Sequence, residues 1–234
     1  YETFGNDAIN ASKILDIVLT KRGAGSQSET ELAGFPFHSL NLYLPKLVKA
    51  GLRVAVCDQL EDPKKTKKIV KRGVTEIITP GLATVDGVVN PKSNNFLASL
   101  HFAGTVGLSL LDISTGEFLI AEGDIEYTAK LLDNFSPNEV LITKENKKHF
   151  VNSYGDSFNL FFLDEWVFNL DYANDLLKKQ FETSSLKGFG IDDLNNGIIS
   201  SSAIMHYLNE TQHERLNHIT SIKRIPKEGH VWLD

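Results

Sequence analysis

The pattern of apolar and polar positions predicts an α/β region in the first third of the chain. A helix capped by Asn6 or Asp7 would place its apolar side chains on one face, at Ala11, Ile14, Leu15 and Val18. It would end at Lys21-Arg22, before Gly23. After a loop at residues 24–31, a second helix would start near Ser39, with apolar positions Leu40, Tyr43, Leu44, Leu47 and Val48. Pro45 should kink this helix or shift its start. Arg53–Asp58 is predicted as a buried strand and Val74–Thr79 as another strand.

The pattern changes after a predicted linker at residues 83–95. Strands are expected at Val106–Ile113 and Glu117–Ala121, joined by a hairpin turn at Ser114–Gly116. Further elements follow, namely a helix near 124–134, strands at Glu139–Thr143 and Leu160–Leu163, and helices near 171–181 and 196–212. A strand hairpin followed by alternating strands and helices predicts a second α/β domain.

Composition narrows the class of protein. The 234 residues, 41% of them hydrophobic, suit one or two globular domains. No apolar stretch reaches the roughly 18 residues of a membrane span, and no signal segment opens the chain. The single cysteine, Cys57, excludes an internal disulfide and fits a reducing compartment. We therefore expect a cytoplasmic protein without a membrane partner.

Charge is unevenly distributed. Residues 1–92 hold 13 Lys and Arg against 10 Asp and Glu, whereas residues 93–234 hold 11 against 20, within a net charge of −6. Three basic features lie in the first region: Lys21-Arg22, the pair Lys46 and Lys49, and Lys64–Arg72 with six positive charges in nine residues. Long cationic side chains of this kind contact phosphates in nucleic acids. A solvated basic loop is the alternative for Lys64–Arg72.

The carboxylates leave a second function open. Asp112 lies on a predicted strand, Glu117 follows on its hairpin partner, and Asp192-Asp193 form an acidic pair. A metal-dependent, ribonuclease-H-like nuclease would use such groups if they converged. The competing interpretation is structural, with Asp112 bonded to the turn at Ser114–Gly116. A scaffold without DNA contact is a third possibility.

The opening segment Tyr1–Ala8 resembles a signature of the MutS family of DNA mismatch repair proteins. Other segments resemble the same family in the same order, and together they span almost the whole chain: Leu15–Gly23, Ala33–His38, Tyr43–Gly51, Val54–Gln59, Asp62-Pro63, Ile77–Gly81, Leu111–Phe118 and Gly188–Gly190.

The resemblance implies a fold class and an organisation. A mixed α/β mismatch-binding domain would occupy residues 1–92, a ribonuclease-H-like connector domain without nuclease activity residues 93–225, and the start of the lever region residues 226–234. The chain would recognise mispaired or unpaired bases by wedge insertion and DNA bending. It would not be an enzyme and would need no cofactor, because the family's ATPase domain, with ATP and Mg, lies elsewhere in the full-length protein.

The resemblance also implies site residues and partners. Tyr1 and Glu2 match the end of the family motif G-x-F-Y-E, whose wedge phenylalanine would immediately precede Tyr1. Tyr1 would pack behind the wedge, and Glu2 would approach the unstacked base. Lys21, Arg22, Lys71 and Arg72 would lie near the DNA backbone. The acidic connector domain would contact a MutL-type partner, with the helix near 171–181 as a candidate surface. The full-length protein would form a homodimer at the nucleoid.

Overall fold

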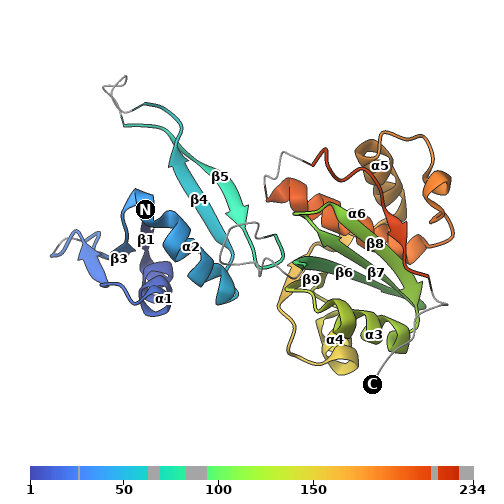
Figure 1. Cartoon of the computed structure of the whole chain (residues 1–234). Helices are drawn as coiled ribbons and strands as arrows, with labels where there is room; N and C mark the ends of the chain where they lie inside the picture. Colours follow the sequence, from blue (N-terminus) through green and yellow to red (C-terminus); the bar gives the residue numbers. More distant parts are fainter. Residues whose placement is uncertain (26, 63–68, 83–93, 212–215, 227–234) are drawn as a thin grey trace. The chain divides into compact units, whose positions relative to one another are not determined.

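The computed structural model describes residues 1–25, 27–62, 69–82, 94–211 and 216–226. The chain divides into two compact units, Tyr1–Ser93 and Asn94–Asp234, each containing helices and sheets (Figure 1). The prediction of two α/β domains is confirmed. Most of the predicted linker, residues 83–93, lies outside the described residues, as do residues 227–234.

The first unit combines two small antiparallel sheets with two helices. Its elements are β1 (Glu2–Phe4), α1 (Gly5–Leu15), β2 (Thr20–Arg22), β3 (Thr30–Gly34), a 3-10 turn (Phe37–Ser39), α2 (Leu40–Lys49), β4 (Val54–Gln59) and β5 (Arg72–Ile78). One sheet has the strand order β1-β3-β2, and β4 pairs with β5 in the other (Figure 1).

Helix α1 is shorter than its apolar pattern predicted. It ends at Leu15 because Asp16 adopts a left-handed conformation with φ 54° and ψ 50°, which short polar side chains tolerate. Val18 is consequently 77% exposed instead of lying on a buried helix face. The predicted capping residues were also wrong: the helix follows Phe4, and no side chain caps it. Lys21 and Arg22 lie on β2, not at a helix end.

The core of this unit lies mainly under helix α2. Its apolar face packs Leu44 and Val48 against Val56 of β4 and Ile78 of β5. Leu47 packs on the other side against α1. A 3-10 turn precedes the helix, which starts at Leu40, one residue after the predicted start near Ser39, and Pro45 lies inside the helix. The strand predicted at 53–58 is present as β4, but the expectation that it is buried was wrong, since Val56 alone among the residues of β4 is buried. A two-stranded sheet covered on one face leaves alternate side chains in solvent.

The second unit contains one mixed sheet with the strand order β10-β9-β6-β7-β8-β11. The strands are β6 (Phe96–Ala103), β7 (Thr105–Asp112), β8 (Glu117–Gly123), β9 (Glu139–Thr143), β10 (Leu160–Leu163) and β11 (Lys223–Arg224). Strands β6, β7 and β8 form an antiparallel meander, while β9 pairs in parallel with β6, β10 with β9, and β11 with β8. This arrangement is the one expected of a ribonuclease-H-like domain. Strand β6 was not predicted.

Helices cover both faces of this sheet. They are α3 (Ile125–Phe135), α4 (Lys147–Tyr154), α5 (Leu170–Gln180) and α6 (Asn195–Glu210), with 3-10 turns at Glu165–Val167 and Leu186–Phe189. Helices α3 and α4 lie on one face and α6 on the other, with α5 packed against α6 (Figure 1). Helix α4 was not predicted, because it buries only Phe150 and so shows little apolar periodicity.

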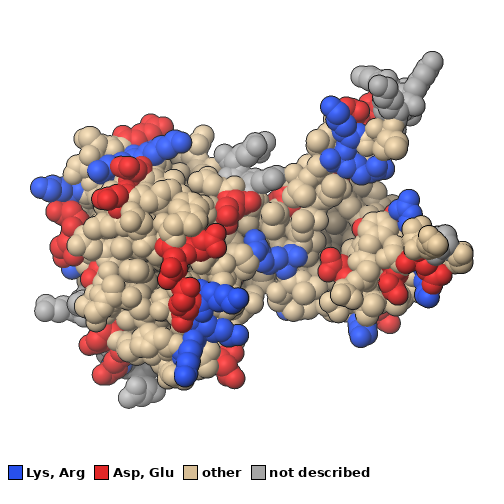
Figure 2. All heavy atoms as spheres, turned by 180° about the vertical axis from the view of Figure 1, so that it is seen from behind, with Lys and Arg blue, Asp and Glu red and all other residues tan. Residues whose placement is uncertain are grey.

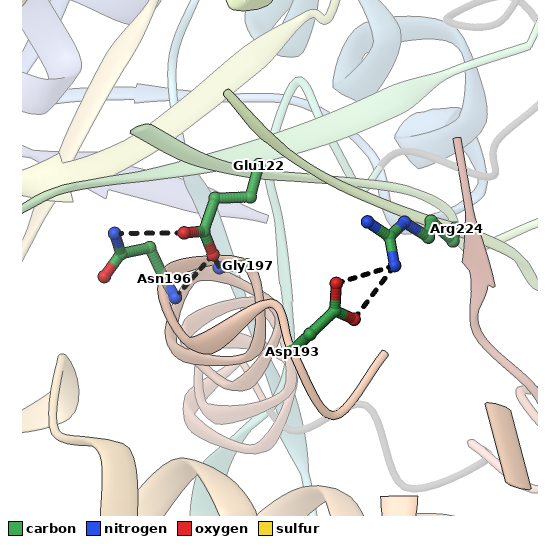
Figure 3. A network of polar contacts seen from close by, with 5 residues as sticks. All are labelled: Glu122, Asp193, Asn196, Gly197 and Arg224. Carbon is green, nitrogen blue, oxygen red and sulfur yellow. Dashed lines mark hydrogen bonds and ion pairs between the residues drawn. The ribbon is translucent and has the colours of Figure 1, made fainter. Parts of the chain in front are cut away.

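The start of α6 is fixed to the sheet by a carboxylate. One oxygen of Glu122, on β8, accepts hydrogen bonds from the backbone nitrogens of Asn196 (2.9 Å) and Gly197 (3.2 Å) (Figure 3). A Cβ atom at Gly107 of β7 would lie 2.0 Å from the carbonyl carbon of Asn196, so only glycine allows this close approach. In the preceding turn, Asp193 accepts two 2.9 Å hydrogen bonds from Arg224 of β11 (Figure 3).

Candidate nucleic-acid interface

Two side chains of strand β1 lie on the same exposed face of its sheet. Because successive residues of a strand point to opposite faces, Glu2 and Phe4 share one face. Arg22 of β2 reaches this face across β3: its guanidinium lies 5.7 Å from the centre of the Phe4 ring and 3.9 Å from a Glu2 oxygen. The three side chains place a carboxylate, a cation and an aromatic ring side by side.

Tyr1 is held from several directions. Its backbone nitrogen donates to the Phe35 carbonyl at 2.8 Å, and its ring stacks on Phe37 with ring centres 5.5 Å apart. Its hydroxyl donates a 2.7 Å hydrogen bond to Asp58 of β4. Burial, followed by this hydrogen bond and the negative charge of Asp58, raises the pKa of Tyr1 to about 12. The phenol therefore stays protonated and remains a donor at neutral pH.

A glycine lets β1 lie close to β3. A Cβ atom at Gly34 would come within 2.7 Å of the Tyr1 carbonyl oxygen and 3.3 Å of the Glu2 side chain. Since the nearest atom belongs to the backbone, a larger residue would displace Tyr1 and the strand that begins at Glu2.

Four of the six predicted site residues line one groove, which has a volume of about 1100 Å³. They are Tyr1, Glu2, Arg22 and Arg72. Its other walls include Phe4, Phe37, Asp58, Gln59 and Glu61. Lys21 and Lys71 do not line it. The alternation of β1 could have indicated Phe4, but no local signal in the sequence indicates Asp58, which meets Tyr1 only through the fold.

The two lysines are engaged with neighbouring carboxylates. Lys21 forms a hydrogen-bonded ion pair with Glu29, and this bond raises the pKa of Lys21. The same bond, helped by a backbone bond from Gly25, lowers the pKa of Glu29. Lys71 lies 3.9 Å from Glu61. Both lysines are more than half exposed, so solvent weakens these pairs and phosphates can compete for them.

Basic side chains gather at the end of the β4–β5 hairpin where β4 ends and β5 begins (Figure 2). Lys71 and Arg72, at the start of β5, are exposed there. Residues 64–68 of the basic run lie outside the described residues. Lys46 and Lys49 are exposed on α2, and Lys46 lies over the Tyr43 ring at 5.4 Å.

The described carboxylates of the second unit do not form a metal centre. Asp112 is 1% exposed, and one of its oxygens accepts bonds from the Ser114 backbone nitrogen (2.8 Å) and hydroxyl (2.6 Å). The predicted structural role of Asp112 at the turn is confirmed. Asp193 is paired with Arg224. Among the residues that the structure describes, no group of three or more His, Cys, Asp or Glu side chains could hold a metal ion. The nuclease alternative is not supported.

Across the described part of the chain, no helix combines the length and apolar character needed to cross a membrane.

Comparisons with known proteins agree with the division into two units. The family model described as MutS domain I matches residues 1–87, and that described as MutS domain II matches residues 95–220. The whole chain is 62% identical to the DNA mismatch repair protein MutS of Flavobacterium psychrophilum, 60% to that of Christiangramia forsetii and 53% to that of Bacteroides fragilis. In each case it spans 27% of the relative's length.

Proposed function

Since this chain belongs to the MutS family of DNA mismatch repair proteins, we propose that its first unit recognises mispaired or unpaired bases in duplex DNA. The observation that carries the proposal is the groove shared by Tyr1, Glu2, Arg22 and Arg72. It brings cations suited to phosphates together with a carboxylate and aromatic rings suited to a displaced base. Residues 1–92 form the mismatch-binding domain in this proposal.

The proposed mechanism reads deformation of the duplex. Opening a base step for an inserted wedge costs a few kcal/mol, and least at a mispaired or bulged position. Glu2 is repelled by phosphates and so disfavours an undistorted duplex. An unstacked base that presents a donor offsets this repulsion through a hydrogen bond to the carboxylate. Tyr1 packs behind the wedge and holds Glu2 in place.

The basic residues position the duplex. Arg22 and Arg72 contact phosphates from within the groove, and Lys21 and Lys71 extend this contact beside it. The carboxylate partners of Lys21, Arg22 and Lys71 are exposed, so exchanging them for phosphates costs little. Such contacts give affinity and register without base preference.

The second unit is proposed to relay the recognition event. Residues 93–225 act as a connector whose acidic surface meets a MutL-type protein, with α5 as a candidate contact. Residues 226–234 begin the lever region. The full-length protein is a homodimer in this proposal. Its ATP and Mg²⁺ bind a domain other than the matched domains I and II. This chain itself needs no cofactor and catalyses no reaction. The protein works in the cytoplasm, at the nucleoid.

The test compares binding to a duplex with one unpaired thymine and to its matched counterpart at low salt. It uses the protein extended to the length of its relatives, with and without Glu2→Ala. The unsubstituted protein should prefer the bulged duplex, and Glu2→Ala should reduce that preference by strengthening binding to matched DNA. Glu76→Ala removes the same charge from β5 outside the groove and should leave the preference unchanged. Equal binding of the unsubstituted protein to both duplexes contradicts the proposal.

A further inference from the structure

Asp58 joins three strands of the first unit. One carboxylate oxygen accepts the 2.7 Å hydrogen bond from the Tyr1 hydroxyl, next to β1. The other oxygen accepts a 3.2 Å hydrogen bond from the Thr75 hydroxyl on β5. Asp58 itself lies on β4, so the side chain connects the start of the chain to both strands of the hairpin.

A register irregularity lies on β5, opposite this part of β4. Val56 pairs with Glu76 and Cys57 with Val74, so Thr75 is the extra residue, as in a β-bulge. Burial along β4 still alternates: Val56 is buried, Cys57 exposed and Asp58 half-buried, which places Asp58 on the same face as Val56. The extra residue Thr75 is the one whose hydroxyl bonds to Asp58, and β-bulges commonly lie beside functional sites.

The Tyr1–Asp58 bond adds a connection that the backbone does not supply. Tyr1 and Phe35 exchange two backbone hydrogen bonds, of 2.8 and 3.0 Å, and these attach the start of β1 to β3. Those bonds leave the sheet containing β1 and the β4–β5 hairpin as separate sheets. The Tyr1 hydroxyl joins them directly through Asp58, one strand position from the exposed Gln59–Arg72 pair that ends the ladder.

We propose that Asp58 is a positioning residue for base discrimination: by holding the Tyr1 hydroxyl, it sets where the neighbouring Glu2 carboxylate lies relative to Arg72 on the hairpin. This inference rests on the proposed function of the groove. Tyr1 immediately precedes Glu2, the first residue of β1, so anchoring the Tyr1 ring fixes the backbone from which the Glu2 side chain extends. A carboxylate held in one direction tests a base edge selectively, whereas one that swings repels every duplex alike.

Two substitutions at Asp58 separate its charge from its hydrogen bond. Asp58→Asn and Asp58→Ala both remove the negative charge, but asparagine keeps an oxygen that can accept from Tyr1. Tyr1→Phe removes the donor and keeps the ring. Tyr43→Phe is the matched control, because this tyrosine lies outside the groove and packs against Phe35. Each variant is made in the protein at the length of its relatives, and thermal unfolding confirms that it is folded.

The measured quantity is the ratio of affinities for the bulged and matched duplexes, together with the salt dependence of each. Asp58→Ala and Tyr1→Phe should each lower the ratio about threefold to tenfold, the range that one net hydrogen bond corresponds to. The salt slope should stay constant, since no phosphate contact is removed. Asp58→Asn should keep most of the ratio, and the double variant Tyr1→Phe/Asp58→Ala should lose no more than either single variant.

The outcomes distinguish this inference from the proposed function. A folded Asp58→Ala protein with an unchanged ratio overturns the positioning role while leaving the mismatch-sensing groove intact. Equal loss in Asp58→Asn and Asp58→Ala also overturns it, because charge would then be responsible. Absence of any bulge preference in the unsubstituted protein instead refutes the proposed function itself.

Discussion

The guanidinium of Arg22 lies 3.9 Å from the carboxylate of Glu2. The two residues lie on the two outer strands of the three-stranded sheet, Glu2 on β1 and Arg22 on β2. Their side chains are 66% and 57% exposed, so water screens the pair and it contributes little to stability. In the absence of DNA, each charge partly offsets the other. A phosphate that binds Arg22 would leave Glu2 without this partner. The Glu2 carboxylate would then repel the DNA backbone more strongly, unless a base edge offers it a hydrogen-bond donor. This ion pair thus couples the proposed binding of phosphate by Arg22 to the proposed testing of a base by Glu2.

Arg22→Ala should weaken binding to bulged and matched duplexes by a similar factor. Because it removes one phosphate contact, the slope of log affinity against log salt should fall by about one unit. Binding titrations at several salt concentrations measure the slope. Lys13→Ala removes an exposed charge from the last turn of α1 and should leave the slope unchanged. An unaltered slope in Arg22→Ala would favour a scaffold that does not use this residue on DNA.

The pKa of Tyr1 gives a pH-dependent measure of its contact with Asp58. Burial, and after it the Asp58 hydrogen bond, raises this pKa from its ordinary value of 10.0 to about 12. The folded state therefore favours the protonated phenol, and the resulting stabilisation is fully present below about pH 10 and lost as the pH rises from 10 to 12.

Nuclear magnetic resonance of tyrosine-labelled protein can follow this titration. At pH 11 the Tyr1 ring should remain mostly protonated. In Asp58→Ala it should ionise at lower pH, because both the hydrogen bond and the nearby negative charge are removed. Tyr1→Phe identifies the resonance by its disappearance. A Tyr1 signal that titrates near pH 10 in the unsubstituted protein would show that the phenol does not contact Asp58.

Local pattern predicted the elements that bury a regular apolar face, and it missed contacts made across the fold. Strands β9 and β10 lie where their apolar runs placed them, at Glu139–Thr143 and Leu160–Leu163. Arg22 was expected at a helix end, because nothing in the helical pattern shows that Asp16 turns left-handed and terminates α1.

The candidate site could be predicted only through family resemblance to its motif. Tyr1 and Glu2 stand in that motif, but Asp58 lies on β4, 57 residues from Tyr1, and meets its hydroxyl only in the folded unit. The groove also depends on Gly34, whose importance comes from the atom opposite it and not from its own conformation.

Gly34→Ala should displace β1, the strand that carries Glu2. The added Cβ would lie 2.7 Å from the Tyr1 carbonyl oxygen, which is too close, so β1 must move away from β3. Overpacking of this kind costs about 1–3 kcal/mol. Urea unfolding should show this loss, and the bulge preference should fall at the same time because Glu2 moves with the strand. Gly51→Ala is a control for the general effect of replacing glycine: this residue has a positive φ, and an added Cβ meets no atom within 4 Å. It should destabilise the unit without changing the preference of the folded protein.

In the second unit, Glu122 should stabilise the fold through the start of α6. Its carboxylate accepts two backbone hydrogen bonds from the first turn and a 3.5 Å bond from the Asn196 side-chain amide (Figure 3). It also accepts a 2.7 Å hydrogen bond from the Thr105 hydroxyl. A negative charge at a helix N-terminus is also favoured by the helix dipole. Glu122→Ala removes these interactions from a half-buried position and should lower the free energy of unfolding by about 1–3 kcal/mol.

Glu122→Gln separates the charge from the acceptor. Glutamine keeps an oxygen for the backbone nitrogens and loses the charge, so its effect should fall between those of the unsubstituted protein and Glu122→Ala. Glu126→Gln provides the comparison, because this exposed residue forms only an i,i+4 pair with Lys130 and should change stability little. Chemical denaturation measures all three variants. Since the bonded groups lie wholly within the second unit, DNA discrimination by the first unit should be unaffected while α6 is destabilised. An equal effect of Glu122→Ala and Glu126→Gln on unfolding would show that the Glu122 carboxylate does not hold the start of α6 to the sheet.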